Sequence, residues 1–343
     1  MRSIGALALL LYLGLAGPGW ADWWADATVC SDPSARPDAR INACAAIIQS
    51  NETPPVNLPI AYSNRGLAHA AKGEYGFAIR DYDEALRRDP ELTRAYAGRG
   101  GAHQALGEHD DAIRDFDEAL RRDGEDSTSY RRRGDSYAAK HEYEEAIRNF
   151  DGAIGLDPED AAAHLSRGNT YRAKAQYELA VRDYDEALRL DPENVTVYWH
   201  RGLARFFHGE FDAAAPDLDR AVATTRPGAN GILWRYLARS RGAQRTDIAA
   251  AAANVDLETW PGPIVAMFLG RTLPAELLRA AEDPHPVRRR NQTCQAVFFI
   301  GQQLLLLGKK GDAMPLFEQV RDGCPRGSPE QAGADAELAR RVN

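Results

Sequence analysis

The chain has 343 residues, and its 42 basic and 50 acidic side chains give a formal net charge of −8. A mildly acidic surface that carries both signs of charge argues against nucleic acid and against anionic lipid as the main partner. Beyond the first twenty or so residues, no stretch is apolar enough to cross a bilayer, so we expect no membrane span.

Residues 1–21 have the pattern of a secretory signal peptide. Arg2 supplies a positive start, Ile4 to Ala16 form a 13-residue apolar stretch, and small residues follow at Gly19 and Ala21. An uncleaved short anchor is the alternative. A lipid anchor would need a cysteine directly after the signal, and position 22 is Asp. We therefore expect a mature protein that is soluble in the periplasm or secreted further.

Four cysteines form two well-separated pairs, Cys30 with Cys44 and Cys294 with Cys324. In an oxidising compartment, an even number of cysteines predicts structural disulfides. A metal site and free thiols are the alternatives, but the separations within the pairs resemble no common zinc knuckle. We expect no metal and no cofactor.

Residues 22–58 contain one helix predicted from about Asp38 to Gln49. Its Cys44 and Ile48 fall where the second helix of a preceding repeat would place its small and large residues, so the segment is interpreted as a half-repeat cap. Cys30 would tie the leading stretch of chain to this helix. The run from Thr53 to Pro59 is a linker too rich in proline for a helix.

Residues 59–228 contain a sequence pattern that recurs every 34 residues. "RDYDEALRRDP" at residue 80 returns as "RDFDEALRRDG", "RNFDGAIGLDP" and "RDYDEALRLDP". Five segments align without a gap: 59–92, 93–126, 127–160, 161–194 and 195–228. Each carries a glycine, two alanines and a large side chain at fixed places with helical spacing, which predicts two helices per repeat. A lone helical hairpin cannot bury its apolar face, so the repeats should stack.

These residues resemble the tetratricopeptide repeat (TPR) signature, and the resemblance implies an all-α superhelical solenoid. Three positions depart from the pattern: Gly124 replaces the closing proline, and His141 and Ala175 replace the turn glycine.

An arginine precedes the recurring glycine of each repeat, at a position that is usually apolar in the family, and an aspartate or asparagine lies sixteen residues later. The arginines are Arg65, Arg99, Arg133, Arg167 and Arg201, and their counterparts are Asp81, Asp115, Asn149, Asp183 and Asp217. A cationic ladder for an acidic ligand is one interpretation. We favour a structural ladder of pairs across the two helices, because a buried lone charge is costly.

Past residue 228 the period weakens, and residues 229–286 are predicted to form irregular helices before a TPR-like repeat returns in 287–343. Cys294 and Cys324 occupy places where the two ends of that hairpin meet. Residues 328–342 form a charged final helix, predicted to be a solvated cap. With Trp234 and "WPGPIVAMFLG", this tail resembles the C-terminal half of NlpI-type TPR lipoproteins, which implies an envelope scaffold that brings cell-wall hydrolases to a periplasmic protease.

The family resemblance also implies a groove, lined by the residue after each aligned Tyr or His and by those five, eight and nine after it. The candidate binding residues are Arg131, Asp135, Asn169, Arg172, Trp199, Leu203, Phe206 and Phe207. Large exposed aromatic residues are typical interface anchors. The alternative is that the helices of 231–268 cover the fifth repeat and make Trp199, Phe206 and Phe207 core residues.

The sequence carries no zinc-hydrolase motif, no nucleophile elbow and no phosphate loop, so we expect no enzyme. His69 and His103 occupy the same place in two repeats, which indicates packing. The predicted function is a periplasmic, non-catalytic adaptor that holds a peptide or helix of a protein partner, such as an envelope hydrolase or protease by resemblance. The alternatives are a self-associating homo-oligomeric envelope component and, less favoured, a cell-wall-active enzyme.

Overall fold

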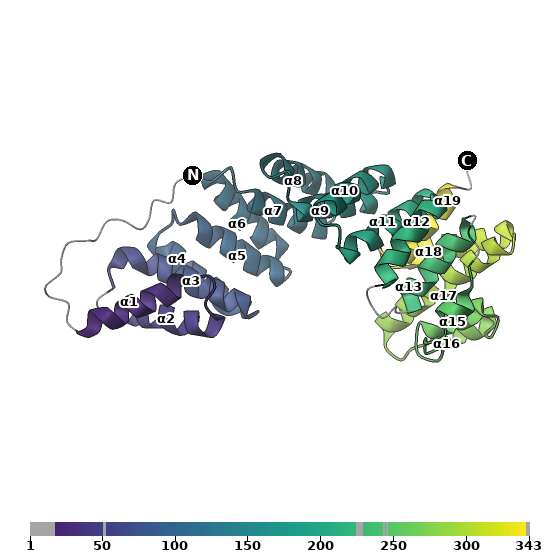
Figure 1. The fold of residues 1–343 in the computed structure, drawn as a ribbon, viewed down its shortest axis with the longest axis horizontal. Coiled ribbons are helices and arrows are strands. Elements are labelled where there is room, and N and C mark those ends of the chain that lie inside the picture. Colours follow the sequence, from purple (N-terminus) through teal and green to yellow (C-terminus); the bar gives the residue numbers. More distant parts are fainter. Residues whose placement is uncertain (1–17, 51–52, 224–228, 243, 245, 341–343) are drawn as a thin grey trace. The chain divides into compact units, whose positions relative to one another are not determined.

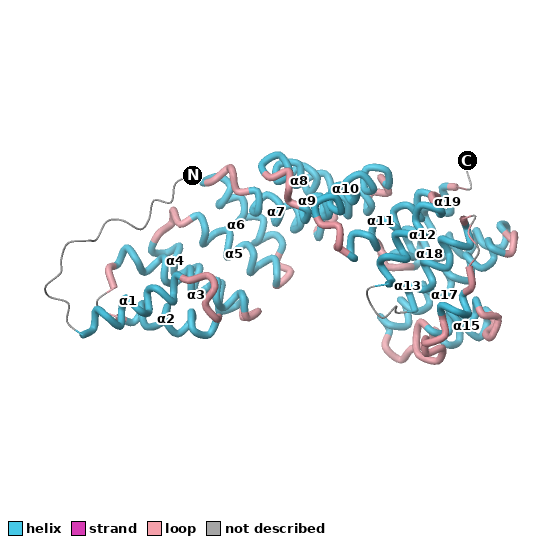
Figure 2. Tube along the Cα trace, in the orientation of Figure 1, coloured by secondary structure: helices cyan, strands magenta, loops and turns pink. Residues whose placement is uncertain are grey.

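A computed structural model describes residues 18–50, 53–223, 229–242, 244 and 246–340. The predicted signal peptide falls mostly outside these residues. All regular elements among the described residues are helices joined by short loops (Figures 1 and 2). The chain divides into two compact units, Met1–Asp157 and Pro158–Asn343, which we call the N-terminal and the C-terminal unit.

The N-terminal unit begins with two helices where the sequence predicts one. α1 (Pro18–Ser31) packs on α2 (Pro37–Gln49), and the disulfide between Cys30 and Cys44 joins them with an S–S distance of 2.09 Å. The indole Nε1 of Trp23 also donates to Thr53 Oγ1 over 2.9 Å. The expected leading stretch is therefore helical, since Trp23, Ala27 and Val29 have the buried cysteine pair to pack against.

Three helical hairpins complete the N-terminal unit. After a 3-10 turn (Pro55–Asn57), they are α3 (Leu58–Ala71) with α4 (Tyr75–Arg88), α5 (Thr93–Ala105) with α6 (His109–Arg122), and α7 (Ser127–Ala139) with α8 (Tyr143–Leu156). Each hairpin packs on the next through its second helix. The repeated alanines Ala78, Ala112 and Ala146 are fully buried, which lets the helix backbones approach closely.

The C-terminal unit starts with two more hairpins, α9 (Ala161–Ala173) with α10 (Tyr177–Leu190) and α11 (Val195–His208) with α12 (Phe211–Ala223). α13 (Ala229–Arg241), α14 (Ile248–Ala251), α15 (Gly262–Phe268) and α16 (Pro274–Ala280) follow as shorter or irregular helices. α17 (Pro286–Leu306) and α18 (Lys310–Gly323) form a last hairpin, closed by α19 (Pro329–Ala339). No described helix is both long and apolar enough to span a bilayer.

α19 differs from the solvated cap that the sequence predicts. Glu337 is only 3% exposed. Its carboxylate accepts a hydrogen bond from Arg241 Nη1 over 2.7 Å, and Arg340 donates to the backbone oxygen of Phe207 over 2.7 Å. Glu337 and Arg340 therefore help to fix the last helix onto α11 and α13, because the buried carboxylate has a cationic partner and the guanidinium has a backbone acceptor.

Candidate partner-binding groove

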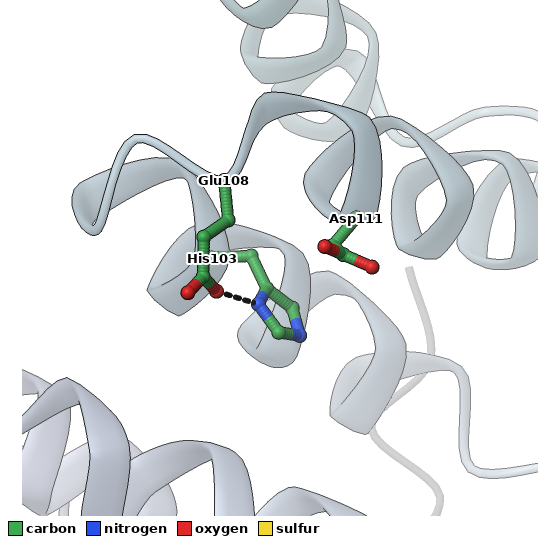
Figure 3. A group of neighbouring side chains, drawn as sticks. All are labelled: His103, Glu108 and Asp111. Carbon is green, nitrogen blue, oxygen red and sulfur yellow. Dashed lines mark hydrogen bonds and ion pairs between the residues drawn. The ribbon is translucent and has the colours of Figure 1, made fainter.

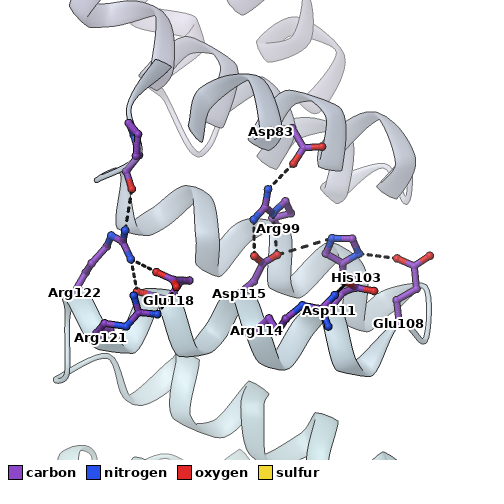
Figure 4. Close-up of polar contacts among 11 residues, drawn as sticks. Asp83, Arg99, His103, Glu108, Asp111, Arg114, Asp115, Glu118, Arg121 and Arg122 are labelled. Atoms are coloured by element: carbon purple, nitrogen blue, oxygen red, sulfur yellow. Dashed lines mark hydrogen bonds and ion pairs between the residues drawn. The ribbon is translucent and has the colours of Figure 1, made fainter. Parts of the chain in front are cut away.

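The arginines that precede the repeat glycines pair with the matching acidic residues across each hairpin. Arg99 donates from Nε and Nη2 to the two carboxylate oxygens of Asp115, over 2.9 and 2.7 Å. Its remaining nitrogen Nη1 reaches Asp83 of the preceding repeat over 2.5 Å (Figure 4). One guanidinium therefore joins the helices of its own repeat and connects that repeat to its neighbour.

A similar arrangement, with one partner in the same repeat and one in the preceding repeat, returns elsewhere in the ladder. Arg201 contacts Asp217 and Asp185, and Arg133 contacts Asn149 and Asp117. The within-repeat pairs are Arg65–Asp81, Arg99–Asp115, Arg133–Asn149, Arg167–Asp183 and Arg201–Asp217. Because the ladder arginines use their donors on the protein itself, this geometry favours the structural interpretation over an acidic ligand.

His103, Glu108 and Asp111 place three possible metal ligand atoms within 4.8 Å of one another (Figure 3). His103 Nδ1 lies 2.6 Å from Glu108, and its Nε2 lies 3.9 Å from Asp115. In the first repeat, His69 repeats both distances with Glu74 and Asp81, while Phe77 stands where Asp111 would be and stacks on the imidazole. The same two contacts thus occur in a repeat that lacks the third possible ligand. This indicates a structural role, in which the histidine connects the glutamate of the turn with the aspartate of the ladder.

The N-terminal unit has two neighbouring cavities of about 320 and 430 Å³, which share four lining residues. First-helix residues of three successive repeats line them, most at the positions implied by the family resemblance: Ser63, Leu67, Ala70, Ala97, Gly101, Gln104, Ala105, Arg131 and Asp135. We call these two cavities together the N-terminal groove. Of the residues predicted for binding, Arg131 and Asp135 therefore lie in it, and they face each other as an ion pair of 3.6 Å.

Two further arginines of this groove, Arg94 and Arg132, are absent from the sequence prediction. Both are exposed, and neither side chain forms an ion pair with a carboxylate of the described residues. They lie two residues before and two residues after an aligned tyrosine, outside the positions that the family resemblance implies. The one feature of the sequence that could have pointed to them is a positive charge on the first helix of a repeat.

Two glycines leave room for the side chains of Tyr82 and Arg132 at the floor of the groove. A Cβ on Gly98 would lie 2.5 Å from the ring of Tyr82, and a Cβ on Gly101 would lie 2.5 Å from Nη1 of Arg132. A tyrosine hydroxyl is neutral at neutral pH, and burial raises the pKa of Tyr82 further, to about 12, so this hydroxyl can donate a hydrogen bond. The floor of the groove thus combines a phenol with two guanidinium groups.

Asn169 and Arg172 lie in the C-terminal unit, beside Tyr184 and His200. The hydroxyl of Tyr184 donates to Asn169 Oδ1 over 2.9 Å, and the ring of His200 stacks on that of Tyr184. Burial, together with the charge of Arg172, lowers the pKa of His200 to about 4. Arg172 is thus a cation beside a neutral imidazole, and both side chains are partly covered.

The prediction that the fifth repeat offers apolar anchors is wrong for three residues. Leu203, Phe206 and Phe207 are each at most 2% exposed, and both phenylalanines contact the ring of Trp234 with centroids 5.2 and 5.6 Å away. Trp199 is half-buried against the same core. The alternative interpretation is therefore correct for these residues: α13 and later helices cover the fifth repeat.

A cavity of about 330 Å³ also lies beside the disulfide between Cys294 and Cys324. Its cations are engaged: Arg289 lies 3.9 Å from Glu282, and Arg290 donates to the backbone oxygen of Gly323. It offers a partner less charge than the N-terminal groove.

Models of the tetratricopeptide repeat match residues 59–92 and 93–126, and a TPR repeat model matches residues 134–174 and 168–209. These segments are TPR repeats, and the all-α fold is a TPR solenoid, as predicted. None of the curated proteins compared with this chain matches it.

Several solved structures have a similar arrangement of helices. MamA (41 to end) from Desulfovibrio magneticus RS-1 is 22% identical, with 50% of this chain and 96% of that chain covered and a TM-score of 0.47. YrrB, described as a TPR protein with an unusual peptide-binding site, is 20% identical, with 56% and 97% covered and a TM-score of 0.47. PilF of Pseudomonas aeruginosa is 17% identical, with 82% and 99% covered and a TM-score of 0.47.

Proposed function

We propose that this chain, whose residues 59–126 and 134–209 are TPR repeats, is a non-catalytic adaptor that holds a segment of a protein partner in its N-terminal groove. The observation that carries this proposal is the groove itself, to which the first helices of three successive repeats contribute open side chains. A row of first helices suits an extended or helical segment, because successive repeats offer similar contacts at regular spacing.

The compartment is the bacterial periplasm in this proposal. Two buried cysteine pairs at disulfide distance suit an oxidising environment, and the expected signal peptide would deliver the chain there. The resemblance of the tail to NlpI-type proteins adds an envelope role, in which the partner is a cell-wall hydrolase or a protease.

Site-specific photo-crosslinking in the periplasm tests the proposal directly. A benzoylphenylalanine at Ala105, an exposed residue of the groove, should crosslink a discrete partner protein. The matched control places the same group at Arg87, an exposed residue of α4 that lines neither cavity. An identical crosslinking pattern from both positions, or no adduct from Ala105, would overturn the assignment of the groove.

Self-association is the competing function, and it predicts adducts between copies of the chain. Sedimentation of residues 22–343 over a range of concentrations separates the two ideas. A mass of one chain throughout agrees with the adaptor, whereas a mass that rises with concentration, together with Ala105 adducts of twice the chain's mass, favours self-association.

A further inference from the structure

We propose that the N-terminal groove selects an acidic segment, and that Arg94 and Arg132 bind its carboxylates. This inference rests on the proposed function and adds the chemistry of the partner. The chain as a whole is acidic, yet the groove carries Arg94, Arg131 and Arg132 against only two carboxylates, those of Asp126 and Asp135.

Both carboxylates of the groove already have partners. Asp126 caps α7 and accepts hydrogen bonds from the backbone N–H and the hydroxyl of Ser129, at 3.2 and 2.5 Å. Asp135 pairs with Arg131. Arg94 and Arg132 therefore supply the excess positive charge, because neither of them is neutralised by an ion pair within the described chain.

The environment of the two arginines favours binding of an anionic group from a ligand. Neighbouring atoms cover part of the Arg94 guanidinium and lower its pKa, although the side chain as a whole stays exposed, and no ion pair offsets this loss of hydration. A guanidinium presents a planar set of donors that matches a carboxylate, and such charge-assisted hydrogen bonds are about twice as strong as neutral ones. The carboxylate of a bound ligand would replace the hydrogen bonds to water that the guanidinium loses in the groove.

Tyr82 and the apolar wall define the rest of the ligand. The neutral phenol of Tyr82 can donate a further hydrogen bond to a carboxylate between the arginines. Leu67, which is 48% exposed, and the alanines beside it offer contact to aliphatic parts of the segment. The ligand is thus a peptide with Asp or Glu interspersed with small or aliphatic residues, and the polypeptide supplies contacts that a free anion lacks.

The binding test uses the chain from residue 22 to 343 with its disulfides intact and fluorescence anisotropy as the readout. Three labelled twelve-residue peptides share one Ala and Leu framework and carry Glu, Gln or Lys at the same four places. We expect binding of the Glu peptide alone, weakened by added salt because the contacts are ionic. Equal binding of the Gln peptide would overturn the inference.

Variants locate the contact. Arg94→Ala and Arg132→Ala should each weaken binding of the Glu peptide by about tenfold, the effect of losing one charge-assisted bond. Arg80→Ala is the matched control, since it removes an exposed arginine of α4 that lines neither cavity, and it should change the affinity less than twofold. Equal losses in all three variants would show a general charge effect and contradict the inference.

Two further measurements test whether a loss of binding reflects misfolding and whether the arginines bind a small free anion instead of a peptide. Arg132→Glu should lose the Glu peptide and gain the Lys peptide, a result that an unfolded protein cannot produce. Inorganic phosphate at the same ionic strength as a chloride control should not compete; specific displacement by phosphate would instead assign the arginines to a free anion. If Ala105 still crosslinks its partner while the Gln peptide binds as well as the Glu peptide, the adaptor function stands and only the acidic preference falls.

Discussion

Arg133 donates from Nε to the side-chain oxygen of Asn149 over 2.7 Å, at the place where the other four repeats present a carboxylate. The amide of Asn149 donates in turn to the backbone oxygen of Glu145 over 2.8 Å. An uncharged partner is therefore tolerated at one step of the ladder, where Arg133 also contacts Asp117.

The ladder predicts graded effects of substitution at Asp115. Asp115→Asn should lower the free energy of unfolding by about 1 kcal/mol, because an amide can still accept from Arg99. Asp115→Ala should cost about 2–3 kcal/mol, because it leaves a half-buried guanidinium with only Asp83. Urea denaturation measures both. An alanine variant as stable as the asparagine variant would show that the ladder contributes little to stability.

The turn between the helices of a repeat requires a positive φ. Gly107 has φ 78°, while Ala175 holds φ 57° in the same turn of the fourth repeat. Ala175→Gly should raise the free energy of unfolding by about 0.5–1 kcal/mol, and Gly107→Ala should lower it by about 1 kcal/mol.

Gly155 is the matched control for this prediction. It also has open space around its Cα, but it lies inside α8 with helical backbone, so Gly155→Ala should be stabilising by about 0.5–1 kcal/mol. The same sign for Gly107→Ala and Gly155→Ala in thermal denaturation would contradict the role of the backbone angle.

His200 should make the C-terminal unit sensitive to mild acid. Its pKa falls from 6.5 to about 4 on folding, mainly through burial and also through the charge of Arg172. Well above pH 6.5 the imidazole is neutral in both states and the group contributes no pH dependence. As the pH falls towards 4, the unfolded chain takes up a proton that the folded chain refuses, and stability is lost by on the order of 2–3 kcal/mol.

The comparison of the parent chain with His200→Gln isolates this contribution. The difference in unfolding free energy between the two proteins should change steadily between pH 6.5 and 4 and stay constant above pH 7. A flat difference across the whole range would mean that the pKa of His200 does not change on folding.

Substitutions in the aromatic core around Trp234 should lower the stability of the protein and leave partner binding unchanged. Phe207→Ala removes a side chain that is 2% exposed and should lower the free energy of unfolding by about 3–5 kcal/mol. Below the unfolding transition, binding to the N-terminal groove should be unchanged. Loss of partner crosslinking at Ala105 in a folded Phe207→Ala protein would contradict this separation.

The disulfide between Cys294 and Cys324 closes a loop across the hairpin of α17 and α18. Replacing both cysteines by serine should lower the free energy of unfolding by about 2–4 kcal/mol, because the unfolded chain regains freedom. Denaturation of the Cys30→Ser/Cys44→Ser variant with and without reductant should show a shift of the same size. An unchanged midpoint on reduction would show that this crosslink contributes nothing.

By itself, the sequence determined the repeated elements of this protein. The recurrence of glycine, alanine and a large side chain at helical spacing predicts each hairpin, because close helix packing needs those sizes at those places. The ladder could be inferred in the same way, since Arg99 and Asp115 recur with their repeats. Arg131 and Asp135 were expected in the groove because the family resemblance implies particular first-helix positions, and the repeat period carries those positions from one repeat to the next.

Only the tertiary structure decided which faces stay open. Phe206 and Phe207 have the pattern of exposed anchors, yet α13 covers them, and no local spacing reports what a helix some 25 residues later in the chain will bury. Arg94 and Arg132 have the pattern of ordinary surface charges, yet the stacking of three repeats and two close glycines brings them beside Tyr82. Periodicity is a local property of the chain, whereas exposure and charge balance arise from contacts between distant segments.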